Sequence, residues 1–245
     1  MHKLESIQHF SFDKDGVLID VHHYWVSVIS VRARAICHSL GITSIETEDF
    51  LISAMGVDRP HFRIKKGGPI GYSPRPVVAA AALNALKETG ERTISIQDIE
   101  EIFLEVDGMT TQNLENWCVL IQSVDQGLTT LWENDRTLSV VTSDRTALAT
   151  QTLILHNLRQ MFSTVIGGDR VKAGKPNPEG ILLACEEVGI STKNTAYVGD
   201  TLGDMEAAKA AGVCAIGITS GLADAEELEL SADFVISELT ELRIG

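Results

Sequence analysis

Short apolar runs alternate with helical patterns through the second half of the chain. The runs resemble buried strands and span residues 138–142, 164–166, 195–198, 214–218 and 234–236. Between them, residues 178–188 and 202–211 repeat apolar side chains at helical spacing, and a glycine follows each pattern. Strands that alternate with helices indicate a parallel sheet covered on both faces. We expect the apolar segment 7–12 to be the first strand of this sheet.

The stretch between that first strand and the other strands has a helical character. Amphipathic or helical patterns cover residues 22–40, 50–55, 77–87, 96–106 and 111–132. A basic, glycine-rich run at 59–71 interrupts them and is expected to be a loop. The sequence therefore predicts two domains, an α/β core of residues 1–20 and 135–245 and a helical insert of residues 21–134.

The composition restricts the partners of such a protein. Its 245 residues carry a net charge of -14, from 34 acidic and 20 basic residues. A surface of this sign repels nucleic acids and anionic membranes, so neither is an expected partner. No apolar run reaches the length of a membrane span and no signal peptide is evident, which predicts a cytoplasmic protein. The four cysteines fall in apolar segments without metal-binding spacing, so we expect reduced core residues.

Two carboxylates, Asp13 and Asp15, stand where the first apolar segment meets Gly16. Side chains two residues apart on a strand point the same way, so both can serve one site at the end of the strand. One carboxylate can then attack a substrate while the other handles a proton. The alternative is a surface turn, since aspartate and glycine are common turn residues.

Three later loops also carry polar side chains at the ends of predicted elements. Thr142 and Ser143 follow one strand, Lys175 precedes a helix, and a Gly-Asp-x-x-Gly-Asp stretch with Asp200 and Asp204 follows another strand. In open parallel sheets, ligands bind beyond the carboxyl ends of the strands. Taken singly, each loop is explained by a helix cap or a turn. Their joint occurrence favours a single catalytic site.

The collected side chains suit phosphoryl transfer through an aspartyl-phosphate. A carboxylate can approach a phosphate only if several negative charges are neutralised, and Lys175 together with Mg²⁺ would do this. Magnesium prefers oxygen ligands and commonly takes one or two protein carboxylates. Asp13 and Asp200 meet that requirement.

The four motifs resemble those of the haloacid dehalogenase-like hydrolases, a superfamily dominated by Mg²⁺-dependent phosphatases. The first motif matches Asp13-x-Asp15-Gly16, the second Thr142, the third Lys175, and the fourth Gly199-Asp200-x-x-x-Asp204. The resemblance covers residues 1–20 and 135–245. It implies a doubly wound, Rossmann-like core, and the position of the helical insert is similar to that of a cap of the first type in this superfamily.

The resemblance also implies a role for each matching residue. Asp13 would be the nucleophile and Asp15 the general acid and base, which distinguishes a phosphatase from a dehalogenase. Thr142 and the Ser143 main chain would hold the phosphoryl oxygens, and Lys175 would balance their charge. Gly16, like Ser143, would contact the substrate. The Mg²⁺ ligands would come from Asp13, the Asp15 carbonyl and Asp200, with Asp204 supporting the metal site.

In this superfamily the cap selects the leaving group, so the helical insert should contain further substrate contacts. His23 belongs to an aromatic and polar group just after residue 20, and Arg63 belongs to the basic run at 59–71. Both are candidate substrate-binding residues. The alternatives are that the aromatic group packs in the cap while its histidines face solvent, and that the basic run is a solvated loop.

The resemblance predicts an enzyme that hydrolyses phosphate monoesters of a small phosphorylated metabolite, as a monomer or a homodimer. A sugar-phosphate phosphomutase using the same aspartyl-phosphate is the nearest alternative. A signalling receiver domain also combines acidic residues, a hydroxyl, a lysine and Mg²⁺. The order of its parts differs, and it lacks a large helical insert. A non-catalytic scaffold on this fold is disfavoured, because every motif residue is present.

Overall fold

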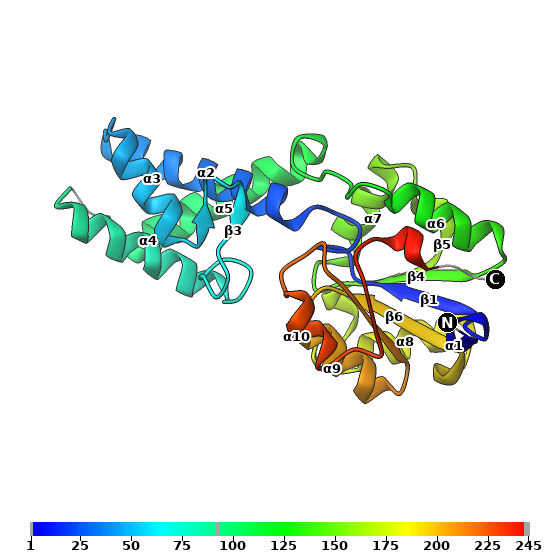
Figure 1. Cartoon of the computed structure of the whole chain (residues 1–245). Coiled ribbons are helices and arrows are strands. Elements are labelled where there is room, and N and C mark those ends of the chain that lie inside the picture. Colours follow the sequence, from blue (N-terminus) through cyan, green and yellow to red (C-terminus); the bar gives the residue numbers. More distant parts are fainter. Residues whose placement is uncertain (1, 92–93, 243–245) are drawn as a thin grey trace. The chain divides into compact units, whose positions relative to one another are not determined.

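The computed structural model describes residues 2–91 and 94–242 and divides into two compact units. The α/β unit contains the chain up to Asp20 and from Leu120 onward, and the helical unit runs from Val21 to Val119 (Figure 1). None of the helices in the described ranges is both long and apolar enough to cross a bilayer. The first boundary agrees with the expected one at residue 20, whereas the second lies at 119 rather than 134.

The α/β unit contains a six-stranded sheet in the order β5-β4-β1-β6-β7-β8. Its strands are β1 (His9–Phe12), β4 (Thr137–Val141), β5 (Phe162–Ile166), β6 (Thr195–Gly199), β7 (Cys214–Ile218) and β8 (Phe234–Ile236). All neighbouring pairs are parallel. The first strand therefore lies in the middle of the sheet, with the strand order reversing beside it, where α/β sheets bind ligands. The predicted parallel α/β core is confirmed.

Helices cover both faces of this sheet. On one face, α8 (Glu179–Val188) and α9 (Leu202–Ala211) pack on a buried apolar cluster that includes Tyr197. On the other face lies α6 (Val124–Glu133), as Figure 1 shows. The remaining elements of this unit are α1 (His2–Glu5), α7 (Thr146–Leu155), α10 (Ala225–Glu229), η2 (Arg159–Met161), η3 (Gly168–Arg170), η4 (Thr192–Asn194) and η5 (Leu239–Glu241).

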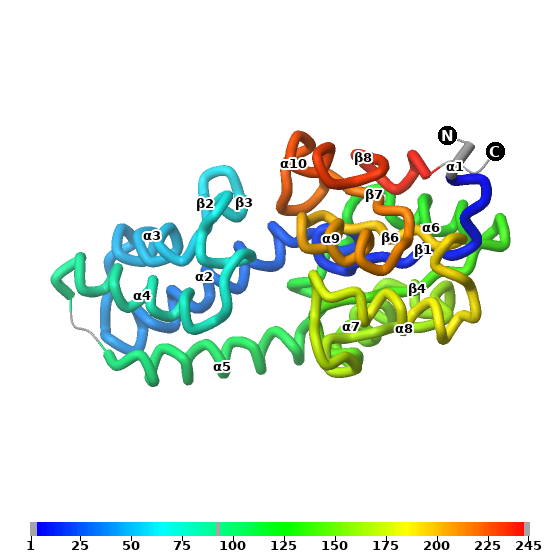
Figure 2. Tube along the Cα trace, turned by 90° about the horizontal axis from the view of Figure 1, so that it is seen from below, coloured from blue at the N-terminus to red at the C-terminus, as the bar shows by residue number. Residues whose placement is uncertain are grey.

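In the described residues of the helical unit, four helices surround a buried core of their own, and Figure 2 shows how they are arranged. They are α2 (Val21–Leu40), α3 (Ile45–Ala54), α4 (Arg75–Thr89) and α5 (Ile96–Gln112), followed by η1 (Leu114–Asn116). The fully buried side chains Ile29, Leu51, Leu86 and Phe103 come from all four helices. The predicted loop at 59–71 differs in detail, because β2 (Val57–Asp58) and β3 (Arg63–Ile64) pair as a short antiparallel hairpin around its start.

The helix predicted over 111–132 is interrupted, and this interruption explains the displaced boundary. Helix α5 ends at Gln112, and α6 begins only after Ser123, whose φ of 70° lies in the left-handed region. Between them, Leu120 forms an antiparallel bridge with Ile19 of the α/β unit. Helix α6 packs against η5 and β4, so it belongs to the α/β unit.

Candidate active site

Asp13 and Asp15 occupy the loop that leaves the central strand β1. The Asp13 N–H donates to the Val198 carbonyl at 2.9 Å, which extends the ladder between β1 and β6 by one residue. The chain then turns at Gly16, whose φ of 82° is accessible mainly to glycine. The turn is closed by Gly16 N–H, which donates to the Ile19 carbonyl at 2.8 Å. Asp13 is thereby held at the carboxyl edge of the sheet.

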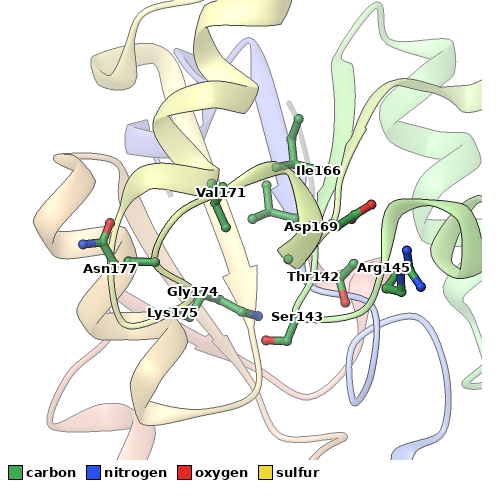
Figure 3. Close-up of a pocket in the computed structure, with 14 residues that line it drawn as sticks. Thr142, Ser143, Arg145, Ile166, Asp169, Val171, Gly174, Lys175 and Asn177 are labelled. Carbon is green, nitrogen blue, oxygen red and sulfur yellow. The ribbon is translucent and has the colours of Figure 1, made fainter.

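Thr142 and Ser143 lie at the same edge, one strand away. Thr142 follows β4 directly, and its N–H donates to the Ile166 carbonyl at 2.9 Å. With Lys175 they line a cavity of about 400 Å³ between the ends of β4 and β5 and the start of α8. Figure 3 shows the side chains of Thr142, Ser143 and Lys175 directed toward the same space. Hydroxyl groups and an ammonium group beside a cavity can bind an anion.

Lys175 connects the carboxylates of the first and fourth motifs. Its Nζ lies 2.9 Å from Asp13 Oδ1 and 2.6 Å from Asp204 Oδ1. It also donates to the Tyr197 hydroxyl at 3.1 Å, and that hydroxyl in turn donates to the Val141 carbonyl at 3.0 Å. A lysine side chain held at three points is a fixed positive charge beside Asp13.

Asp13, Asp200 and Asp204 form a buried cluster in which one oxygen of each residue lies within 4.8 Å of the others. Asp200 Oδ2 accepts a hydrogen bond from Leu222 N–H at 2.9 Å, while Asp200 Oδ1 is buried without a partner among the described residues. Asp204 differs, because its Oδ2 accepts from the N–H and the hydroxyl of Thr201 at 3.1 and 2.6 Å and caps α9.

The charges of this cluster are not balanced by protein groups. Burial raises the pKa of Asp13 to about 7, although the Lys175 ammonium opposes that shift. Burial also raises the pKa of Asp200 well above its usual value, and the neighbouring Asp204 and Asp13 carboxylates act in the same direction. Burial alone would lower the pKa of Lys175, but Asp13 and Asp204 raise it well above its usual value. Three carboxylates thus face one lysine, which favours the binding of a further cation.

The residues present fit a magnesium ion. Mg²⁺ takes oxygen ligands and is commonly bound by one or two carboxylates together with substrate phosphate. The partnerless Asp200 Oδ1 is an unsatisfied buried anion of the kind that a metal ion satisfies. Asp204 belongs to the same cluster, but Lys175 and Thr201 already engage its two oxygens.

The structure brings together most of the predicted residues of the core. Lys175 contacts Asp13 and Asp204, and these two residues form the acidic cluster with Asp200. Thr142 and Ser143 share a cavity with Lys175. Gly16 lies against Asp200, since a Cβ at Gly16 would be 2.2 Å from Asp200 Oδ2.

The two predicted cap residues belong to the helical unit. His23 lies in α2 with its ring 5.6 Å from the ring of Phe62, and Arg63 lies in β3 and is exposed. Their contact with substrate stays a prediction.

Three site residues escaped the sequence reasoning: Lys14, Asp144 and Tyr197. Lys14 is buried, and its Nζ lies 2.5 Å from Asp15 Oδ1 and 3.0 Å from Asp144 Oδ2. A lysine between two aspartates at the end of a buried strand was the available signal. For Tyr197 the signal was a hydroxyl in an otherwise apolar strand, since a buried tyrosine hydroxyl usually requires a partner.

Comparisons with known proteins agree with this geometry. The family model of the haloacid dehalogenase-like hydrolases matches residues 76–218, more than half of the chain. Phosphoglycolate phosphatases of Shigella boydii and Salmonella typhi are each 28% identical over 242 residues, covering 96% of this chain and 90% of the relative.

Solved structures show the same fold. A putative haloacid dehalogenase-like hydrolase from Bacteroides fragilis is 24% identical with a TM-score of 0.65, covering 97% of this chain and 100% of that chain. A predicted phosphoglycolate phosphatase from Haemophilus somnus is 20% identical with a TM-score of 0.69, covering 97% and 96%. A putative beta-phosphoglucomutase from Thermotoga maritima is 22% identical with a TM-score of 0.67, covering 96% of each chain.

The predictions of the family and of a hydrolase are confirmed, and the names of the curated relatives agree with action on phosphoric monoesters. Membership of this family argues against the receiver-domain alternative. The six-stranded parallel sheet, the acidic cluster at its carboxyl edge and the family match lead to one conclusion. This chain belongs to the haloacid dehalogenase-like hydrolase family.

Proposed function

We propose that the protein is a Mg²⁺-dependent phosphomonoester hydrolase that works through an aspartyl-phosphate on Asp13. The observation that carries the proposal is the position of Lys175, whose ammonium lies 2.9 Å from Asp13 at the edge of a cavity lined by Thr142 and Ser143. A carboxylate nucleophile, a fixed cation and two hydroxyl residues there suit the phosphoryl group of a substrate.

The first chemical step transfers the phosphoryl group to the protein. An Asp13 oxygen attacks phosphorus, the bond from phosphorus to the leaving oxygen breaks, and that oxygen takes a proton from the Asp15 carboxyl group. Thr142 and the Ser143 N–H hold the phosphoryl oxygens, and Lys175 offsets their charge. The products of this step are an alcohol and an aspartyl-phosphate.

The second step returns the protein to its starting state. A water molecule attacks phosphorus and gives its proton to the Asp15 carboxylate, and the bond from phosphorus to Asp13 breaks. Inorganic phosphate leaves, Asp13 is a carboxylate again, and Asp15 has regained its proton. The same group serves as acid and then as base, so it has to lie close to phosphorus in both steps.

Asp13, Asp200 and the Asp15 main-chain carbonyl would hold the Mg²⁺ ion, with Asp204 beside them. When bound, the ion supplies positive charge that offsets the phosphoryl oxygens and the clustered carboxylates. The partnerless oxygen of Asp200 supports this assignment. Asp204 contributes chiefly by fixing Lys175 and capping α9.

The substrate we propose is a small phosphorylated acid of the phosphoglycolate type. The support comes from the curated relatives, which are named phosphoglycolate phosphatases and match nearly the whole chain. The helical unit, residues 21–119, would act as the cap that selects the leaving group, with His23 and Arg63 as candidate contacts. In this proposal the protein acts on a small metabolite in the cytoplasm. Its net charge of -14 would repel nucleic acids and anionic membranes, so neither is a proposed partner.

Phosphate release from a panel of metabolite phosphates in the presence of Mg²⁺ tests the proposal. Asp13→Asn should abolish turnover, because an amide oxygen is a poor nucleophile. Asp135→Asn, at an exposed position with a φ of 56°, is the matched control and should retain full activity. Full activity of Asp13→Asn would refute the assignment of Asp13 as the nucleophile. Turnover that needs a bisphosphate primer and releases little phosphate would instead identify a phosphomutase.

A further inference from the structure

Lys14 is a buried cation that the proposed mechanism leaves without a role. Its side chain is only 3% exposed, although it lies in the chain between the two aspartates of the first motif. Burying an ammonium group is costly unless carboxylates pair with it. Lys14 has two such partners, Asp15 Oδ1 at 2.5 Å and Asp144 Oδ2 at 3.0 Å.

Both ends of this arrangement are fixed by the main chain. The Lys14 carbonyl accepts hydrogen bonds from Leu18 N–H at 2.8 Å and Ile19 N–H at 2.9 Å. The Asp144 carbonyl accepts from Gly168 N–H at 2.8 Å, and Asp144 N–H donates to Thr142 Oγ1 at 3.2 Å. Lys14 therefore connects the loop after β1 to the loop after β4.

We propose that Lys14 and Asp144 form a clamp that holds the Asp15 carboxyl group in the orientation needed for proton transfer. In this clamp Lys14 is the positioning residue, Asp144 holds the Lys14 ammonium, and Asp15 is the group positioned. The inference rests on the proposed function, in which Asp15 protonates the leaving oxygen. Rotation of the Asp15 side chain would break its contact with Lys14, so Oδ1 is tethered by this hydrogen bond.

The competing explanation is that Lys14 merely neutralises Asp144. The geometry favours positioning, because the contact of Lys14 with Asp15 is shorter than its contact with Asp144, although the two carboxylates are similarly exposed, at 32% and 35%.

Lys14→Met tests the clamp through two substrates that differ in leaving group, phenyl phosphate and p-nitrophenyl phosphate. p-Nitrophenolate departs readily without a proton, whereas phenolate depends more on the acid. Because kcat/KM covers only the steps through the first phosphoryl transfer, its ratio for the two substrates reports on the acid. We expect kcat/KM for phenyl phosphate to fall at least about tenfold more than for p-nitrophenyl phosphate.

Two further variants separate positioning from charge balance. Lys209→Met makes the same substitution at an exposed lysine of α9 and should leave both values unchanged. Lys14→Met leaves the Asp144 carboxylate without its lysine partner. The double variant Lys14→Met with Asp144→Asn removes this negative charge as well as the lysine. If Lys14 positions Asp15, the double variant keeps the altered substrate ratio of Lys14→Met.

An equal loss on both substrates in Lys14→Met, or recovery of the wild-type ratio in the double variant, would overturn the clamp. The ratio does not depend on the folded fraction, because both substrates are measured on one preparation. If Lys14→Met does not fold, Asp144→Asn carries the test, since it loosens Lys14 and should shift the ratio in the same direction; an unchanged ratio there refutes the clamp. Activity of Asp13→Asn would refute the proposed function instead.

Discussion

The Lys175 ammonium lies 2.6 Å from Asp204 Oδ1, while the other Asp204 oxygen accepts two hydrogen bonds from Thr201. Both oxygens of this carboxylate are therefore engaged by protein groups. Asp200 belongs to the same sequence motif as Asp204. One of its oxygens accepts a hydrogen bond from Leu222 N–H, and the other has no partner among the described residues. The two acids of the fourth motif thus have different surroundings, and they should respond differently to substitution.

Asp204→Asn should lower kcat by about 10- to 100-fold and leave the Mg²⁺ requirement within a few-fold of the original. The amide keeps the shape of the side chain but removes the charge that anchors Lys175. The measurement is a titration of activity with Mg²⁺, which separates the maximal rate from the half-saturating metal concentration. A large rise in that concentration at an unchanged maximal rate would show that Asp204 acts as a ligand.

Asp200→Asn should give the opposite result. It replaces a buried charged oxygen by a neutral amide in the proposed metal site, so the half-saturating Mg²⁺ concentration should rise more than it does for Asp204→Asn. Binding of the metal alone, followed by calorimetry without substrate, provides a second readout. Unchanged metal binding in this variant would remove Asp200 from the site.

Gly16→Ala tests the packing of the first motif against Asp200. The new Cβ would lie 2.2 Å from Asp200 Oδ2, at a φ of +82°. Gly212→Ala is the matched control, because its φ is +72° but its nearest atom, Thr192 Oγ1, lies at 3.9 Å. The control should lose about 1–2 kcal/mol of unfolding free energy from backbone strain alone. Gly16→Ala should lose more unfolding free energy than the control, as measured by thermal unfolding, and should also lose activity. Equal losses of unfolding free energy in the two variants, without a loss of activity, would contradict the close packing of Gly16 against Asp200.

The fold was predictable where its signals are local. Helix α9 begins and ends as its periodicity and the following Gly212 predict, and the apolar runs locate every strand of the sheet. The break between α5 and α6 was not predictable, because helical spacing continues through 111–132 while the pairing of Leu120 with Ile19 joins distant segments. The contact of Lys14 with Asp144 was not predictable for the same reason, since it depends on the sheet bringing two strand ends together.

His9, buried in β1, should make the stability of the protein dependent on pH. Burial lowers the pKa of His9 from 6.5 to about 4, while its ring bonds Ser139 at 2.7 Å and Thr195 at 3.2 Å. Between these pH values the unfolded chain binds more protons at His9 than the folded chain does. The unfolding free energy therefore falls as the pH drops from about 6.5 to 4, by about 3 kcal/mol at most from this group.

Denaturant unfolding at several pH values measures this dependence. His9→Gln should flatten the curve below pH 6.5 relative to the parent protein, because no proton can then bind at that position in the unfolded chain. His38→Gln, at an exposed histidine, is the control and should leave the curve unchanged. The acidic cluster is the same in all three proteins, so its own titration cancels in the comparison. Parallel curves for His9→Gln and the parent protein would show that His9 is not held neutral by burial.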